Sequence, residues 1–144
     1  MRRWVGSRRD GRRLALVGIL VGVGLLTTGC AVLDSHARLT IAILLEDHGD
    51  AIDVTTNPVN VTADTCGSEL DCVEAYSTEE ADYYRFASRD RAADYAATLA
   101  DGFVIHYIVM DFADKNDVST EHQRWAMERL AGTWQDYSGA FPDR

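Results

Sequence analysis

The chain is poor in several features that mark common protein classes. Its 144 residues include 2 prolines and 3 cysteines, and no segment is repeated or of low complexity. This length suits one domain and excludes a multidomain enzyme or a repeat array. No uninterrupted apolar run reaches the ~20 residues of a membrane-spanning helix, which excludes a polytopic membrane protein. The hydrophobic share of 47% is typical of a folded protein.

Familiar catalytic motifs are also missing. There is no G-x-S-x-G or S-x-x-K motif for a serine nucleophile, and no glycine-rich phosphate loop outside the apolar run near the N-terminus. The acidic runs 46–53 and 111–117 lack the frame of a calcium loop, so we expect solvated loops, with a weak cation site as the alternative. The sequence predicts no catalytic residue, no cofactor and no metal site, and it favours a non-enzymatic protein.

Basic residues are scarce beyond the first thirty positions. Residues 1–29 contain six arginines and one acid, a net charge of +5, whereas residues 30–144 contain eight basic and 22 acidic residues, a net charge of −14. A charge of −14 opposes binding to nucleic acid and to anionic lipid head groups. It favours a positively charged protein or peptide as the partner.

The basic N-terminus is followed by a short apolar run. Leu14–Leu26 has 13 residues. A helix of that length spans roughly 20 Å, less than the ~30 Å hydrocarbon core of a bilayer. A basic segment, a short apolar run and then small residues is the order found in export signals. We expect the arginines to remain on the cytoplasmic side.

The apolar run closes with the segment Leu26-Thr27-Thr28-Gly29-Cys30. This segment resembles the lipobox of bacterial lipoprotein precursors, although that family usually has Leu, Val or Ile at the position of Thr27. The resemblance implies that the Cys30 thiol takes a diacylglycerol and that a signal peptidase cuts between Gly29 and Cys30. Residues 1–29 would then be a cleaved signal peptide.

The resemblance also implies a lipid anchor in the cell membrane. Each buried methylene of an acyl chain such as palmitate contributes ~0.8 kcal/mol to membrane binding, so two chains anchor a protein stably where one would not. We expect a short lipidated tether (30–34) and a single extracytoplasmic domain (35–144). A secreted protein and an uncleaved N-terminal anchor are the alternatives. Export by the general or by the twin-arginine route stays open, since Arg8-Arg9 is followed by Gly11 and Arg12 rather than by apolar residues.

Two cysteines remain if Cys30 is lipidated. Cys66 and Cys72 are six positions apart, and outside the cytoplasm such a pair is most simply a disulfide. A redox pair and two unpaired thiols are the alternatives. The spacing is not that of a thioredoxin-like motif, and no basic group flanks either cysteine to lower the pKa of its thiol. We therefore favour a structural disulfide.

The remaining pattern predicts an α+β domain with a small mixed β-sheet and helices packed mainly on one face. Strands are expected over residues 51–56, 59–63, 73–77, 82–87 and 103–112. Helices are expected over 36–48, from the cap Ser88 to Gly102, and from Ser119 or Thr120 to about Trp134. Residues 36–48 also alternate as in a strand, which leaves that segment ambiguous. The aromatic tail from Tyr137 is expected to fold back.

Two details of this prediction concern candidate functional residues. The strand–helix–strand order predicts that strands 82–87 and 103–112 are parallel neighbours, with His106 in the core of the second. Trp125 falls off the apolar face of the last helix and is the favoured aromatic for ligand contact if one is exposed.

The leading hypothesis for the function is a membrane-anchored interaction or envelope-accessory module. The alternative is a small hydrolase or metal-dependent enzyme using His106 or His48 with nearby carboxylates, and a transporter's solute-binding subunit ranks last.

Overall fold

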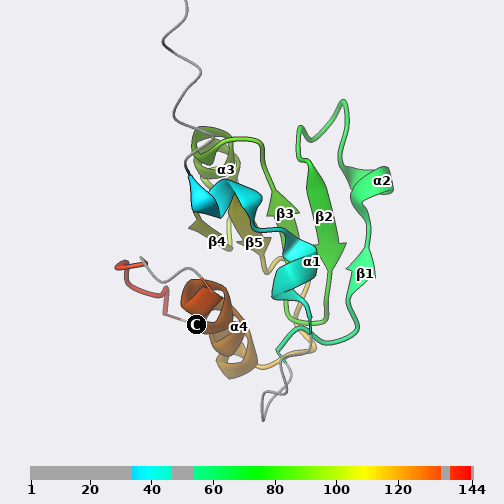
Figure 1. Cartoon of the computed structure of the whole chain (residues 1–144). Coiled ribbons are helices and arrows are strands. Elements are labelled where there is room, and N and C mark those ends of the chain that lie inside the picture. The colour runs from blue at the N-terminus through cyan, green and yellow to red at the C-terminus, as the bar shows by residue number, and fades with distance from the viewer. Residues whose placement is uncertain (1–33, 47–53, 134–136, 144) are drawn as a thin grey trace, which may run out of the picture. The chain divides into compact units, whose positions relative to one another are not determined.

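The computed structural model describes residues 34–46, 54–133 and 137–143. The strands of this part of the chain form one sheet in the order β1-β2-β3-β5-β4 (Figure 1). They are β1 (Val59–Asn60), β2 (Glu74–Ser77), β3 (Asp82–Arg85), β4 (Gly102–Ile105) and β5 (Ile108–Asp111). The helical segments are the 3₁₀ helix η1 (Ser35–Arg38) and the α-helices α1 (Ile41–Leu44), α2 (Thr62–Thr65), α3 (Arg89–Ala96) and α4 (Thr120–Thr133).

This combination of a small sheet and helices confirms the predicted α+β class. Each neighbouring pair of the named strands is antiparallel, so the sheet is antiparallel in detail rather than mixed. The strands predicted at 73–77 and 82–87 are confirmed as β2 and β3. They are joined by a turn in which the Thr78 N–H donates to the Ala81 carbonyl at 2.9 Å.

The segment 103–112 is a hairpin rather than the single strand predicted. Ile105 of β4 pairs with Ile108 of β5, and His106 and Tyr107 form the turn between them. His106 has a φ of 52°, in the left-handed region that glycine most often occupies. The predicted parallel pairing is therefore wrong: the chain reverses at His106, and β5 lies antiparallel beside β3.

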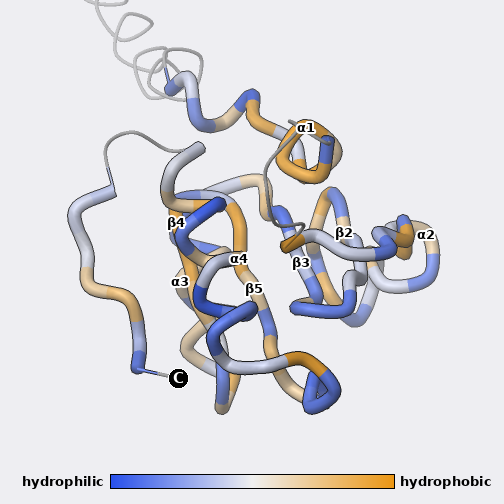
Figure 2. Tube along the Cα trace, turned by 90° about the horizontal axis from the view of Figure 1, so that it is seen from below, coloured by the Kyte–Doolittle hydropathy of each residue, from blue (hydrophilic) through white to orange (hydrophobic). Residues whose placement is uncertain are grey.

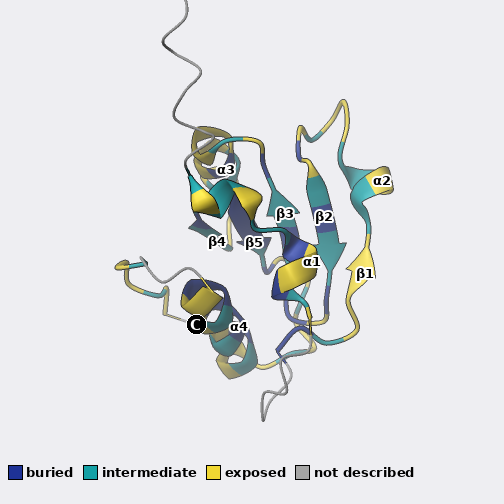
Figure 3. Ribbon diagram, in the orientation of Figure 1, coloured by how far each residue is buried: buried dark blue, intermediate teal, exposed yellow. Residues whose placement is uncertain are grey.

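The two faces of the sheet bury separate apolar clusters, because successive side chains point to opposite faces. On one face the main cluster joins Tyr83, Phe103 and Met110 to apolar residues of α1 and α4. On the other face Ala75 and Val109 pack against α3. Figure 3 shows buried residues on α1 and α4, whereas α2 has none, and α1 is predominantly hydrophobic in Figure 2.

The predicted starts of the two longer helices are confirmed. The Ser88 hydroxyl accepts a hydrogen bond from the Arg91 N–H at 3.3 Å, which caps α3, and Ser119 accepts from the His122 N–H at 3.2 Å ahead of α4. The end of α3 was predicted too late, because the helix stops at Ala96 and Gly102 begins β4 instead. Residues 134–136, which include the predicted end of α4, lie outside the described residues.

The ambiguous segment 36–48 is neither a strand nor one helix. Its described part forms η1 and α1, and Leu39 and Thr40 between them have extended backbone. The side chains of Asp34 and Thr40 accept hydrogen bonds from backbone N–H groups of η1 and α1, respectively. Residues 47 and 48 lie outside the described residues. Two local caps thus divide the segment into two short turns.

The predicted strands on either side of Asn57-Pro58 are mostly absent from the described residues. Residues 54–56 are not in a strand, and residues 51–53 are not described. The second segment contains the two-residue β1 and then α2, which begins where the Asn60 side chain accepts from the Thr62 N–H at 3.0 Å. At the other end of the chain the tail does fold back: the rings of Tyr137 and Phe141 lie 5.7 and 5.8 Å from that of Phe103.

Candidate functional site

Of the three cysteines named in the sequence prediction, the structure describes Cys66 and Cys72. Gly29 and Cys30 lie outside the described residues. The sulfur atoms of Cys66 and Cys72 are at disulfide distance, and their Cα atoms are 4.9 Å apart. This pair closes a loop between α2 and β2, next to the small cluster under α3, and the exposed Arg91 of α3 forms an ion pair with Asp71 of the loop.

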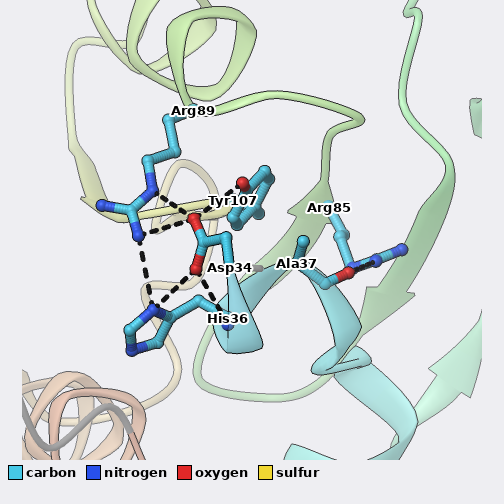
Figure 4. A network of polar contacts seen from close by, with 6 residues as sticks. All are labelled: Asp34, His36, Ala37, Arg85, Arg89 and Tyr107. Carbon is cyan, nitrogen blue, oxygen red and sulfur yellow. Dashed lines mark hydrogen bonds and ion pairs between the residues drawn. The ribbon is translucent and has the colours of Figure 1, made fainter. Parts of the chain in front are cut away.

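The first described residue, Asp34, is the centre of a polar network (Figure 4). Its Oδ2 atom accepts hydrogen bonds from the Tyr107 hydroxyl at 2.9 Å and from Arg89 Nη2 at 2.8 Å. Its Oδ1 atom lies 3.0 Å from both the backbone nitrogen and the Nδ1 atom of His36. The N-terminus of η1, the N-terminus of α3 and the β4–β5 turn therefore meet at one carboxylate.

Two imidazole rings adjoin this network. The rings of His36 and His106 are stacked, with centroids 4.3 Å apart and planes inclined by 26°. His36 Nδ1 also lies 3.3 Å from Arg89 Nη2. His106 is half-buried in a turn rather than in the middle of a core strand, so its predicted environment is wrong. The turn is what brings it against His36.

The surroundings of Asp34 favour its charged form. Partial burial raises the pKa of this carboxyl, but the hydrogen bonds from Tyr107, His36 and Arg89 outweigh it and hold the pKa far below its usual value. The same contacts act in the opposite sense on the phenol, since burial and the adjacent Asp34 raise the pKa of Tyr107. The Arg89 guanidinium lies over the Tyr107 ring, 5.7 Å from its centroid. At neutral pH the network is a carboxylate that accepts hydrogen bonds from three residues, His36, Arg89 and Tyr107.

Asp34 begins a segment that crosses one face of the sheet, which we call the N-terminal strap (residues 34–46). Side chains of the sheet and of α4 bind its backbone. Arg85 donates to the Ala37 carbonyl at 2.6 Å. The Glu74 carboxylate accepts from the first N–H groups of α1 at 2.9 and 3.1 Å, and Arg129 donates to carbonyls at its other end. Carboxylate and guanidinium each lie at the end of α1 where the helix dipole favours their charge.

Sequence reasoning identified the cysteines but missed this network. Asp34 is the N-cap of η1, and its side chain accepts from the His36 N–H. Its other partners, Arg89 and Tyr107, are 55 and 73 positions away, so no local spacing links them. The one sequence signal that bears on the network is the cap Ser88, which predicts that Arg89 begins a helix.

The other predicted candidates remain dispersed. His48 lies outside the described residues. Trp125 is half-buried against the main cluster, with its ring 5.2 Å from that of His122. The Asp111 carboxylate accepts from the Ala113 N–H within its own turn at 3.0 Å. Within the described ranges, no group of three or more His, Cys, Asp or Glu side chains is arranged to hold a metal ion.

A shallow depression lies at the opposite end of the sheet from Asp34. Its volume is about 260 Å³, and its lining includes Asp101, Asn116, Thr120 and Asp143. Lys115 also borders it, but the Lys115 ammonium already binds Ser77, Thr78 and Asp82. The described part of the chain contains no helix with the length and apolar character needed to cross a bilayer.

Comparison of the chain with family models, with curated proteins and with solved structures gives no match.

Proposed function

We propose that the protein is a lipoprotein of the cell membrane, anchored through Cys30, whose domain faces the extracytoplasmic side and acts as an interaction module. The observation that carries the proposal is the order of features at the N-terminus. Six arginines are followed by the apolar run Leu14–Leu26 and by a lipobox-like segment that ends in Cys30. Two acyl chains on that thiol give a stable anchor.

The cysteine pair supports the same compartment. Cys66 and Cys72 are at disulfide distance, and disulfides persist mainly outside the reducing cytoplasm. With these two cysteines committed to each other, Cys30 is the one cysteine of the chain left for modification. The odd cysteine count and the disulfide-distance pair therefore agree with lipidation at position 30.

The start of the fold supports a domain held close to the membrane. Asp34, four positions after Cys30, is bound to α3 and to the β4–β5 turn through Arg89 and Tyr107. A fully extended chain spans at most ~3.6 Å per residue, so Asp34 lies within ~14 Å of the lipidated cysteine. The protein presents its domain at the bilayer surface rather than on a long stalk.

Charge indicates the class of partner for the rest of the domain. Residues 30–144 carry a net charge of −14, and such a charge speeds the approach of cationic molecules and slows that of anionic ones. The module therefore binds a basic protein or peptide. A pull-down of the lipidated protein from detergent-solubilised membranes should recover basic proteins at low salt and lose them at high salt. Recovery of neutral or acidic proteins at all salt concentrations would contradict this assignment.

The anchor is tested by metabolic labelling with a clickable fatty acid. Wild-type protein should carry the label and sediment with membranes, and Cys30→Ser should lose both properties. Cys66→Ser is the matched control, because it removes a different cysteine and should keep the label. Unchanged labelling and sedimentation of Cys30→Ser would refute the proposal.

A further inference from the structure

The sheet has two edge strands, and they differ in the backbone groups that they present to another chain. β1 and β4 lie at opposite ends of the strand order (Figure 1). An edge strand carries N–H and C=O groups that can pair with an added strand. Because the direction of the hydrogen bonds alternates along an antiparallel strand, the register decides which of these groups face outward.

The β1 edge presents little to pair with. The Val61 N–H donates to the Ala75 carbonyl of β2 at 3.0 Å, so the alternation turns Asn60 outward. Two positions before Asn60 the same alternation reaches Pro58, which has no N–H to donate. A strand of 2 residues next to a proline has the features of a protected edge.

The β4 edge presents N–H and C=O groups at two positions. The Phe112 N–H donates to the Asp101 carbonyl at 3.0 Å, so the alternation turns Gly102 and Val104 away from β5. Within residues 34–46, 54–133 and 137–143, no hydrogen bond joins the backbone of Gly102 or Val104 to a group outside the hairpin. The rings of the tail contact Phe103, whose side chain packs on the α4 face of the sheet. The outward backbone groups of β4 are therefore open to a further strand.

The part of the chain around β4 is acidic. Residues 88–144 include α3, β5, α4 and the tail, and they contain ten acidic and six basic residues, a net charge of −4. Four of the cations already form ion pairs with carboxylates: Arg89 with Asp34, Arg91 with Asp71, Lys115 with Asp82, and Arg124 with Glu128. Asp101 directly precedes β4, and Asp111 pairs in register with Gly102. This charge favours an added strand with basic side chains over a second copy of the chain, which would bring its own net charge of −14.

We propose that the β4 edge binds an extended, basic segment of the partner as an added strand of the sheet. The N–H and C=O groups of Gly102 and Val104 pair with the backbone of that segment, and its lysine or arginine side chains meet the acidic surroundings. This inference rests on the proposed function, in which the domain binds a basic protein or peptide. It adds the surface that is used and the conformation that the partner adopts.

The test measures hydrogen exchange of single amides in the lipidated protein, held in micelles of a neutral detergent. The probe is a short peptide of alternating lysine and valine. At a peptide concentration about ten times its Kd, roughly one protein in eleven remains free, so exchange at Gly102 and Val104 should slow about tenfold. Exchange at Asn60 of β1 should stay unchanged. A peptide with glutamate in place of lysine should leave all three amides unaffected.

A proline at the edge supplies the matched variant. Val104→Pro removes an outward N–H without removing a bond to β5, as edge strands tolerate. Loss of that one hydrogen bond should raise the Kd of the lysine peptide about fivefold. Val104→Thr keeps the N–H and the shape of the side chain, and it should leave the Kd unchanged. The exchange experiment on wild type needs no variant, so it decides the question even where Val104→Pro does not fold.

The outcomes separate this inference from the proposed function. Peptide that binds without slowing exchange at Gly102 and Val104, or that binds Val104→Pro as tightly as wild type, would overturn the assignment to β4 and leave the cationic partner intact. No binding of the lysine peptide would overturn the added strand together with the basic partner, while labelling at Cys30 still tests the anchor by itself. Slow exchange at both amides that appears without peptide and grows with protein concentration would assign the edge to a second copy and contradict the proposal.

Discussion

Two buried tyrosines differ in whether the hydroxyl group has a hydrogen-bond partner. Tyr83 is fully buried, and its hydroxyl has no hydrogen-bond partner among the described residues. Burial, and then the carboxylate of Glu80, raise the pKa of Tyr83 above its usual range, so the phenol stays neutral. Tyr107 differs in that its hydroxyl donates to Asp34.

Replacing each tyrosine with phenylalanine should therefore have opposite effects. Tyr83→Phe removes a hydroxyl that is desolvated without compensation, and it should leave the free energy of unfolding unchanged or raise it by about 1 kcal/mol. Tyr107→Phe removes a hydrogen-bond donor from the Asp34 carboxylate and should lower the free energy of unfolding. Urea unfolding of the two variants measures both effects. A clear loss of stability in Tyr83→Phe would mean that its hydroxyl does bind a partner.

The stability of the fold depends on pH through Asp34. The hydrogen bonds around it lower its pKa below the usual 3.8, so the fold gains stability at any pH above that value. As the pH falls below about 4, protonation removes this gain, since an unfolded chain takes up the proton more readily than the folded one.

The variant Asp34→Asn should remove this contribution. Wild type should be more stable than the variant at pH 6, and the gap should narrow steadily between pH 4 and pH 2. Urea midpoints across this range measure it, with Asp94→Asn, an exposed change in α3, as the control for lost charge alone. A gap that stays constant down to pH 2 would contradict the role of the carboxylate.

At the scale of elements, the β4–β5 hairpin depends on an unusual turn residue. His106 occupies the left-handed region at a φ of 52°, which costs a residue with a Cβ atom about 1 kcal/mol relative to glycine. His106→Gly and His106→Ala both lose the ring contact with His36, so the difference between them isolates the backbone effect. We expect the glycine variant to be more stable than the alanine variant by about 1 kcal/mol in urea unfolding. Equal stabilities would show that the turn relaxes to a different conformation.

The same turn explains which elements could be predicted. The start of α3 was predictable because the cap Ser88 and the apolar spacing that follows are local signals. The hairpin was not, because a histidine in an apolar run gives no sign of a reversal. Likewise α1 is held at its ends by Glu74 and Arg129, whose contacts join positions 32 to 85 residues apart. Among the candidate functional residues, a local motif predicted lipidation of Cys30. The Asp34 network arises only when distant elements pack together, so no local motif predicts it.

At the scale of the whole molecule, the cysteine pair links α2 to the sheet. A bond that closes a loop this short removes about 2 kcal/mol of chain entropy from the unfolded state. The double variant with Cys66→Ser and Cys72→Ser should be less stable than oxidised wild type by that amount and close to wild type treated with reductant. Urea unfolding with and without reductant measures this. Equal stability of the double variant and oxidised wild type would show that the loop is already constrained by its other contacts.

The N-terminal strap has a mechanical consequence for a tethered protein. If the protein is anchored at Cys30 as proposed, the strap is the part of the described fold that follows the anchor, and it crosses the sheet without joining its ladder of strand pairs. Pulling would peel the strap away one contact at a time, beginning at Asp34, and these side-chain contacts would give way before the backbone pairing of β2, β3 and β5. Movements of the bilayer would thus be absorbed in the first few residues of the fold, and the surface farthest from the tether would keep its shape.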